Sequence, residues 1–156
     1  MTTELRVEPA DSAASLALQQ LFFADIVTRY PGWSPASSQS VEVSELAPPG
    51  GIWLVAYLDG RPVGCGGLQA LDPHTAEVRR IYLEQDARGR GIGRALLREL
   101  ERRARGLGYH RVRLTTGDSQ PAALGLFRSA GYREIAPFTD GEFTTHWMEK
   151  SLTPAG

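Results

Sequence analysis

The 156-residue sequence has a single cysteine, Cys65, only three histidines and no long apolar run. One cysteine cannot form an intramolecular disulfide, and it excludes the usual cysteine-based zinc sites. His74 and His110 have no ligand-spaced partner, so we expect no metal.

The sequence also lacks membrane and export signals. No stretch approaches the ~20 apolar residues of a membrane-spanning helix. The N-terminus, MTTELRVEP, has an early acid and lacks the cationic start and apolar stretch of a secretory signal. We therefore expect a cytoplasmic protein that has no membrane partner.

The net charge of −1 is unevenly distributed. Residues 77–113 hold eleven arginines and five acids, whereas the rest of the chain has six basic residues and thirteen acids. This segment is expected to meet an anion. A solvated helix face explains part of the excess, because Glu99 and Arg103 stand at i,i+4 spacing. We expect no nucleic-acid partner, since the basic stretch has no recognition motif and no interleaved aromatic residues.

Length and hydrophobic periodicity predict one domain, 1–156, of alternating strands and helices. Helices are expected over 12–30, 41–46, 91–106 and 120–130. Strands are expected over 4–9, 52–58, 61–71, 75–83, 111–116, 133–138 and 143–152. Asp59-Gly60 is a hairpin signal. The order predicts an α/β layered domain built around one sheet.

A glycine-rich turn, Arg88-Gly89-Arg90-Gly91-Ile92-Gly93, joins a predicted strand to a predicted helix. A helix N-terminus offers unpaired N–H groups and a positive dipole end, and glycines let the backbone approach phosphate oxygens. Arg88, Arg90 and Arg94 add positive charge, so a diphosphate fits this turn. A purely structural glycine turn remains open as an alternative.

Two other phosphate motifs are excluded. A P-loop needs Lys-Ser or Lys-Thr after its last glycine, but Arg94-Ala95 follows here. The dinucleotide fingerprint needs a third glycine where Leu96 stands, and Arg111 and Arg113 replace the acid that should end the next strand.

The stretch from about Ile52 to Lys150 resembles the GNAT superfamily of N-acetyltransferases. The turn at 88–93 matches that family's [Gln/Arg]-x-x-Gly-x-[Gly/Ala] motif, and QPAALGLFRSAGY matches its later motif. The resemblance implies a mixed, mostly antiparallel sheet of about seven strands flanked by about four helices. It also implies an acetyl-CoA site and direct transfer of the acetyl group to an amine.

The resemblance assigns roles to particular residues. Ile81 N–H would polarise the thioester carbonyl, as an oxyanion donor does. Gln120 would hydrogen-bond the pantetheine arm, and Leu83 would pair with its amides. The diphosphate would be held by backbone groups from Arg88 to Arg94. The implied cofactor-binding residues are Ile81, Tyr82, Leu83, Arg88, Gly89, Arg90, Gly91, Ile92, Gly93, Arg94, Gln120 and Phe127.

Glu77 is the candidate general base, because it stands where some family members place a catalytic glutamate. Strand alternation predicts that Glu77, Arg79, Ile81 and Leu83 share one face. A solvated strand-end glutamate that pairs with Arg79 or Arg80 is the alternative. The family's tyrosine acid is replaced by Phe127, so the thiolate leaves unassisted, is protonated by water, or uses Tyr132 or Tyr82.

Two functions remain open. The first is an N-acetyltransferase acting on a small-molecule or peptide amine. The second is a binding module that keeps acyl-CoA affinity without chemistry, which Phe127 favours. Trp33, Asp140 and Glu142 are candidate acceptor contacts, and if they line the pocket the acceptor is cationic or aromatic. A homodimer is expected only by analogy with the fold.

Overall fold

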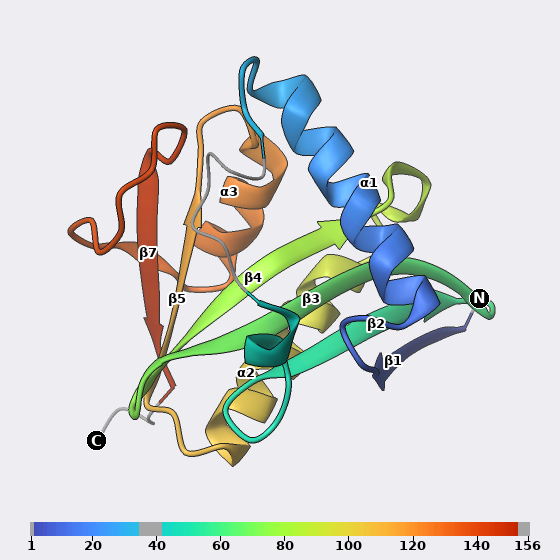
Figure 1. Ribbon diagram of the computed structural model, residues 1–156, viewed down its shortest axis with the longest axis horizontal. Helices are drawn as coiled ribbons and strands as arrows, with labels where there is room; N and C mark the ends of the chain where they lie inside the picture. Colours follow the sequence, from blue (N-terminus) through green and yellow to red (C-terminus); the bar gives the residue numbers. More distant parts are fainter. Residues whose placement is uncertain (1, 35–41, 153–156) are drawn as a thin grey trace.

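The computed structural model describes residues 2–34 and 42–152 and is built around one seven-stranded sheet, in the order β1-β2-β3-β4-β5-β7-β6. Only β4 and β5 run parallel to each other, and every other neighbouring pair is antiparallel. The mixed, mostly antiparallel sheet expected from the sequence is therefore confirmed. Figure 1 shows the sheet with α1 crossing one face.

The elements follow one another with short connections. The strands are β1 (Thr3–Val7), β2 (Ile52–Leu58), β3 (Arg61–Asp72), β4 (Thr75–Leu83), β5 (Arg111–Thr116), β6 (Arg133–Glu134) and β7 (His146–Ser151). The α-helices are α1 (Ala13–Arg29), α2 (Ile92–Gly106) and α3 (Pro121–Ser129). Two short 3-10 helices are Val43–Leu46 and Gln85–Ala87.

The described residues hold three α-helices, so the expectation of about four is wrong. The expected helix over 41–46 is a single 3-10 turn at Val43–Leu46, while residue 41 lies outside the described residues. Its capping box at Glu42 and Glu45 closes one turn, and the cis Pro48-Pro49 pair follows soon after. Proline cannot continue a helix, so nothing extends this turn.

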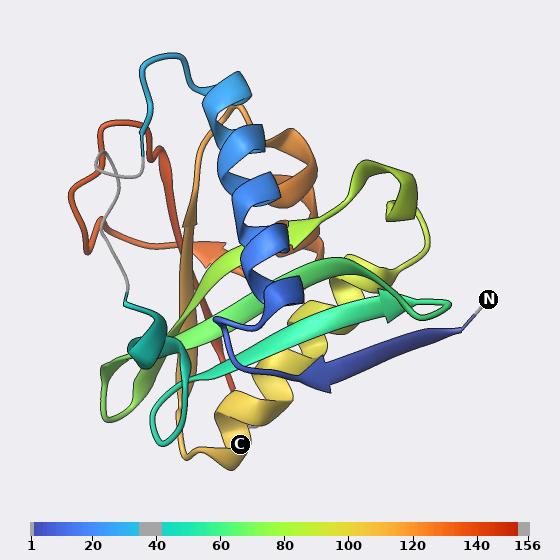
Figure 2. The same ribbon diagram turned by 45° about the vertical axis from the view of Figure 1, so that its right-hand side comes forward.

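The sheet carries a core on each face (Figure 2). One core joins α2 and α3 to the sheet through Leu96, Leu100 and Phe127. The other packs Leu18 of α1 against Trp53 and neighbouring side chains of β2 and β3, including the buried Cys65. The central strands are thus covered by helices on both faces.

The parallel pair β4–β5 separates early. Its register covers only residues 75–77 of β4 and 111–113 of β5, although both strands continue for several residues. Figure 1 shows the two strands diverging from this common start. The far half of β4 therefore has a strand beside it on the β3 side only.

No helix of the described residues is long and apolar enough to cross a membrane. Over the same parts of the chain, no group of three or more His, Cys, Asp or Glu side chains is arranged to hold a metal ion.

Candidate functional site

A β-bulge in β4 decides which side chains reach each face of the sheet. The β3–β4 register jumps between the pairs Cys65–Tyr82 and Gly67–Arg79, and Arg80 has a positive φ of 56°. Val78 and Ile81 both pack toward the α2–α3 core, although they are three residues apart. One extra residue has thus been inserted into the alternation.

The bulge overturns the expected placement of Glu77 and Ile81 on one face. Glu77 and Arg79 alternate with Val78, so they lie on the α1 face, whereas Ile81 packs on the α2–α3 face. Arg80 also lies on the α1 face, because its guanidinium donates to Gln19 Oε1 over 2.5 Å. Counting by twos along the strand fails here because a bulge shifts the phase by one residue.

The glycine-rich turn builds the N-terminus of α2 as predicted. Gly89 and Gly91 have φ of 79° and 80°, a region that other residues occupy at a cost. Gly91 is the N-cap and supplies no side-chain hydrogen bond to the first turn. The first N–H groups of this 15-residue helix thus remain without a side-chain cap.

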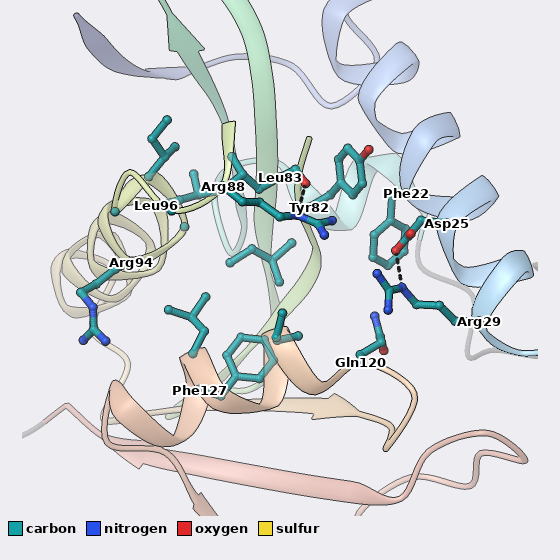
Figure 3. Close-up of a pocket in the computed structure, with 18 residues that line it drawn as sticks. Phe22, Asp25, Arg29, Tyr82, Leu83, Arg88, Arg94, Leu96, Gln120 and Phe127 are labelled. Carbon is teal, nitrogen blue, oxygen red and sulfur yellow. Dashed lines mark hydrogen bonds and ion pairs between the residues drawn. The ribbon is translucent and has the colours of Figure 1, made fainter. Parts of the chain in front are cut away.

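This helix end opens onto a cavity of about 330 Å³, which we call the anion cavity (Figure 3). The turn, β4, α1 and α3 all contribute side chains to it. Its lining residues are Phe22, Asp25, Arg29, Ile81, Tyr82, Leu83, Arg88, Gly89, Gly91, Ile92, Gly93, Arg94, Leu96, Gln120, Ala122, Ala123, Leu126 and Phe127.

Three arginines and one acid line the anion cavity. Arg88 Nε donates to Leu83 O at 3.1 Å, which fixes the turn against the end of β4. Arg94 donates to Ser129 Oγ at 2.5 Å and links α2 to α3. Arg29 pairs with Asp25 at 2.9 Å and donates to Ser119 O at 3.1 Å. The surplus of positive charge suits an anionic ligand.

A second cavity, of about 230 Å³, is lined by residues of α1, β4, β5 and nearby loops, and we call it the aromatic cavity. Its lining residues are Phe22, Phe23, Ile26, Tyr30, Trp33, Val78, Arg79, Arg80, Thr115, Thr116, Gly117, Gln120, Phe143 and Thr144. Phe22 and Gln120 line both cavities, so the two cavities meet at these side chains.

Gln120 is held at this junction by two hydroxyl groups. Its Oε1 accepts from Tyr30 at 3.4 Å and from Thr116 at 3.3 Å. Tyr30 comes this close because Gly117 has no side chain, and a Cβ there would collide with the hydroxyl. With Oε1 engaged, the Nε2 group of Gln120 is the donor left for a ligand at the junction.

Glu77 lies beside the aromatic cavity and does not line it or the anion cavity. Its side chain is 5% exposed, and its carboxylate is 3.5 Å from Arg79 Nη1. Burial raises the pKa of Glu77, and the positive charge of Arg79 opposes this shift. A carboxyl group with a raised pKa is a stronger base than an exposed glutamate.

The hydroxyl groups near the junction differ in availability. Phe127 lines the anion cavity and is buried at 2% exposure against Tyr132. The Tyr132 hydroxyl donates to Glu101 at 2.9 Å inside the core, and burial raises its pKa strongly, so it is not placed to act in the cavities. Tyr82 lines the anion cavity with its ring packed edge-on against Phe22 of α1. The Tyr30 hydroxyl lies at the junction, where it donates to Gln120.

The structure gathers most of the predicted residues around the anion cavity. Arg90 and Glu77 are the exceptions, since neither lines it. Trp33 lines the aromatic cavity, whereas Asp140 and Glu142 do not. Sequence reasoning missed side chains from the C-terminal half of α1. Phe22 lines both cavities, Asp25 and Arg29 line the anion cavity, and the C-cap residue Tyr30 lines the aromatic cavity. Their signal was weak, because an amphipathic pattern shows which face of a helix is apolar and not which end lines a cavity.

The loop before Gln120 is held by contacts between Asp118 and residues at or just before the start of β7. His146, at the start of β7, contacts Asp118 through Nε2 at 2.6 Å and Glu134 through Nδ1. Hydrogen bonds to Asp118 and then Glu134 raise the pKa of His146, and the bond to His146 lowers the pKa of Asp118. Thr145 Oγ1 also accepts from Asp118 N at 3.0 Å.

Replacing His146 by Gln is expected to lower Tm by about 1–3 °C near pH 5.5, because exposed ion pairs contribute little. A raised histidine pKa stabilises the fold fully below the ordinary value of about 6.5, and this contribution is lost as pH rises through the folded-state pKa. Asp118, with a lowered pKa, contributes above its ordinary value of about 3.9. The difference in Tm should therefore shrink as pH rises from the ordinary histidine value through the raised pKa of His146, and thermal melts across pH 4.5–9 measure it. A constant difference would contradict the role of protonated His146.

Comparisons with known proteins place the chain in a family. A family model described as the acetyltransferase (GNAT) family matches residues 17–132. An IAA acetyltransferase of Azospirillum brasilense is 33% identical over 140 residues, which are 87% of each chain. The N-alpha-acetyltransferase RimI of Mycobacterium tuberculosis is 40% identical over 107 residues, 66% of this chain and 63% of that protein.

The solved structure of yncA from Salmonella typhimurium with its cofactor acetyl-CoA superposes with a TM-score of 0.74. The match covers 100% of this chain and 97% of that chain at 19% identity. It supports the same fold.

Proposed function

Because this chain belongs to the GNAT family of acetyltransferases, we propose that it transfers the acetyl group of acetyl-CoA to an amine. The observation that carries the proposal is the meeting of two cavities at Gln120, one arginine-rich at a helix N-terminus and one lined by aromatic side chains. One substrate in each cavity would bring the two together at Gln120.

The arginines and the helix N-terminus of the anion cavity support its assignment to coenzyme A. The uncapped start of α2, with Arg88 and Arg94 beside it, would hold the diphosphate. The pantetheine arm carries amides, and the part of β4 that no longer pairs with β5 offers them an open strand edge near Leu83. Apolar residues of α3, such as Leu126, would cover the arm.

Acetyl transfer needs a proton acceptor and a stabiliser for the developing negative charge. In our proposal the amine nitrogen attacks the thioester carbon, the N–H proton passes through a water to Glu77, and the C–S bond breaks. Ile81 N–H would donate to the carbonyl oxygen as charge develops on it. The water is required because Glu77 does not itself line the aromatic cavity.

Tyr30 is the proposed donor to the departing thiolate. Its single O–H hydrogen, which Gln120 Oε1 accepts in the protein alone, would turn to the sulfur while Thr116 keeps its hydrogen bond to Gln120. Tyr30 reaches the junction from the end of α1, whereas Phe127 of α3 has no hydroxyl. Burial raises the pKa of Tyr30, so this hydroxyl stays protonated where a free thiol with a pKa of about 8.5 ionises. It can therefore deliver a hydrogen bond or a proton at neutral pH.

Replacing Tyr30 by Phe is expected to lower kcat by about 10–100-fold, with little change in acetyl-CoA affinity, because general acid catalysis contributes at most ~10²–10⁴ and a thiolate leaves readily. The pH–rate profile should also lose any decline above pH 9. Steady-state kinetics of both proteins from pH 6 to 10 provide the measurement. An unchanged kcat would show that the thiolate leaves without Tyr30.

Release of free coenzyme A in the presence of a panel of amines tests the proposed function. We expect turnover that depends on both acetyl-CoA and an amine, together with the N-acetylated product by mass spectrometry. Acetyl-CoA binding without turnover on any amine would favour the alternative, an acyl-CoA-binding module. No binding of acetyl-CoA would contradict both functions.

A further inference from the structure

The aromatic cavity contains two adjacent positive charges and, among its described lining residues, no acid. Arg79 and Arg80 would point to opposite faces of a regular strand. The bulge in β4 instead brings both to the α1 face, where both line the cavity. The bulge that places Glu77 and Ile81 on different faces of the sheet therefore also brings two positive charges into the aromatic cavity.

Both arginines are held in place by hydrogen bonds to neighbouring side chains. Arg80 donates to Gln19 Oε1 at 2.5 Å, and its guanidinium lies 5.0 Å from the centre of the Phe23 ring. Gln19 is itself anchored, since its Nε2 donates to Ala10 O at 2.7 Å. Arg79 donates to Gln69 Oε1 at 3.1 Å in addition to its contact with Glu77.

Arg80 is half-buried next to a second positive charge. Burial lowers the pKa of Arg80, and the neighbouring charge of Arg79 lowers it further. Two half-buried guanidinium groups of like charge repel each other, and an anion between or beside them relieves that repulsion. Guanidinium groups bind carboxylates with paired, charge-assisted hydrogen bonds.

The rest of the cavity wall is aromatic. Phe23 stacks on Trp33 with ring centres 5.9 Å apart, and Tyr30 packs against Phe143 at 5.8 Å. Phe22 closes the side that meets the anion cavity. These flat walls suit an aromatic or branched apolar group.

We propose that the acceptor is an amine that also carries a carboxylate, with an aromatic or apolar side chain, as in a hydrophobic α-amino acid. Arg79 and Arg80 bind the carboxylate, the aromatic walls hold the side chain, and the amine faces Gln120 at the junction. This inference rests on the proposed function, because it assigns the aromatic cavity to the acceptor. It also replaces the cationic acceptor that Asp140 and Glu142 would have favoured.

Matched ligand pairs test the inference by binding alone. Calorimetry in the presence of free coenzyme A compares phenylalanine with 2-phenylethylamine, leucine with 3-methylbutylamine, and tryptophan with tryptamine. We expect at least one acid to bind about tenfold or more tightly than its decarboxylated partner. No preference for the acid in any pair, or no binding of any acid at millimolar concentration, would overturn the inference.

Variants assign the preference to the arginines. Arg80→Asn removes the charge and tolerates the positive φ, since asparagine adopts this conformation readily. It should abolish the preference, while Arg80→Lys retains part of it. Arg102→Gln, which removes an exposed charge on the far part of α2, is the matched control and should keep it. Thermal melts check folding, and Arg79→Gln serves if Arg80→Asn does not fold. A preference that survives both substitutions contradicts the assignment.

Turnover separates this inference from the proposed function. A protein that binds phenylalanine tightly but acetylates no amine of the panel contradicts the proposed transfer and leaves the carboxylate site standing. A protein that acetylates 2-phenylethylamine as well as phenylalanine contradicts the carboxylate site and leaves the transfer standing.

Discussion

Replacing Gly91 by Glu is expected to abolish measurable acetyl-CoA binding, a loss of about 100-fold or more. Gly91 is the N-cap of α2 with φ of 80°, and it lines the anion cavity. A glutamate there adds a side chain where the backbone must approach the diphosphate, and it places a negative charge against the phosphates. Titration calorimetry with acetyl-CoA measures the effect.

Gly108→Glu is the matched control for this prediction. Gly108 has φ of 93° and, like Gly91, open space around the position of a Cβ, but it lies beyond the other end of α2. Both substitutions carry the same backbone penalty and the same charge change. We expect comparable losses of Tm, with acetyl-CoA affinity retained only in Gly108→Glu. Equal affinities in the two variants would remove the diphosphate from the turn.

Glu77→Gln is expected to lower kcat/KM by about 10²–10⁴, the usual contribution of a general base. Acetyl-CoA affinity should barely change, because Glu77 does not line the anion cavity. The wild-type rate should rise with pH as Glu77 loses its proton, at a pH above the ordinary glutamate value because burial raises its pKa. That rising limb should vanish in the variant.

A role in positioning Arg79 would produce a different pattern. Without Glu77, Arg79 would lose its carboxylate partner, so KM for the acceptor would rise while the pH limb stayed in place. Glu45→Gln is the matched control, since exposed Glu45 contacts the same network through Gln69 and carries the same charge. We expect this control to keep both kcat and the pH limb. An effect of Glu77→Gln below about threefold would place the base elsewhere.

The sequence predicted the framework closely for reasons visible in particular residues. The strands 52–58, 75–83 and 111–116 have the predicted bounds, because apolar runs there end at Gly, Pro or charged turns. The helix expected over 91–106 begins one residue later, at Ile92, with Gly91 as its cap. Where local residues mark the ends of an element in this way, the folded structure keeps the predicted bounds.

The parts that sequence reasoning missed depend on non-local geometry. No local pattern marks the bulge at Arg80. The inserted residue changes the register of pairing with β3 but leaves the amino-acid composition of the segment typical of a strand. The expected strand over 133–138 shortens to Arg133–Glu134, and the one over 143–152 begins only at His146. Tyr30 reaches the junction only because α1 crosses the sheet, and the length of a helix does not show what lies under its end.

The separation of β4 from β5 has a consequence for the protein without its ligand. An unpaired stretch of strand inside a sheet is a template for any extended chain, including a neighbouring molecule. Backbone amides near Leu83 should exchange with deuterium rapidly when the anion cavity is empty and slowly once a pantetheine arm lies alongside. Saturating acetyl-CoA should also raise Tm, because a ligand that binds only the folded state stabilises it. The co-substrate would then act as a temporary strand of the sheet, and concentrated stocks should resist aggregation better when it is present.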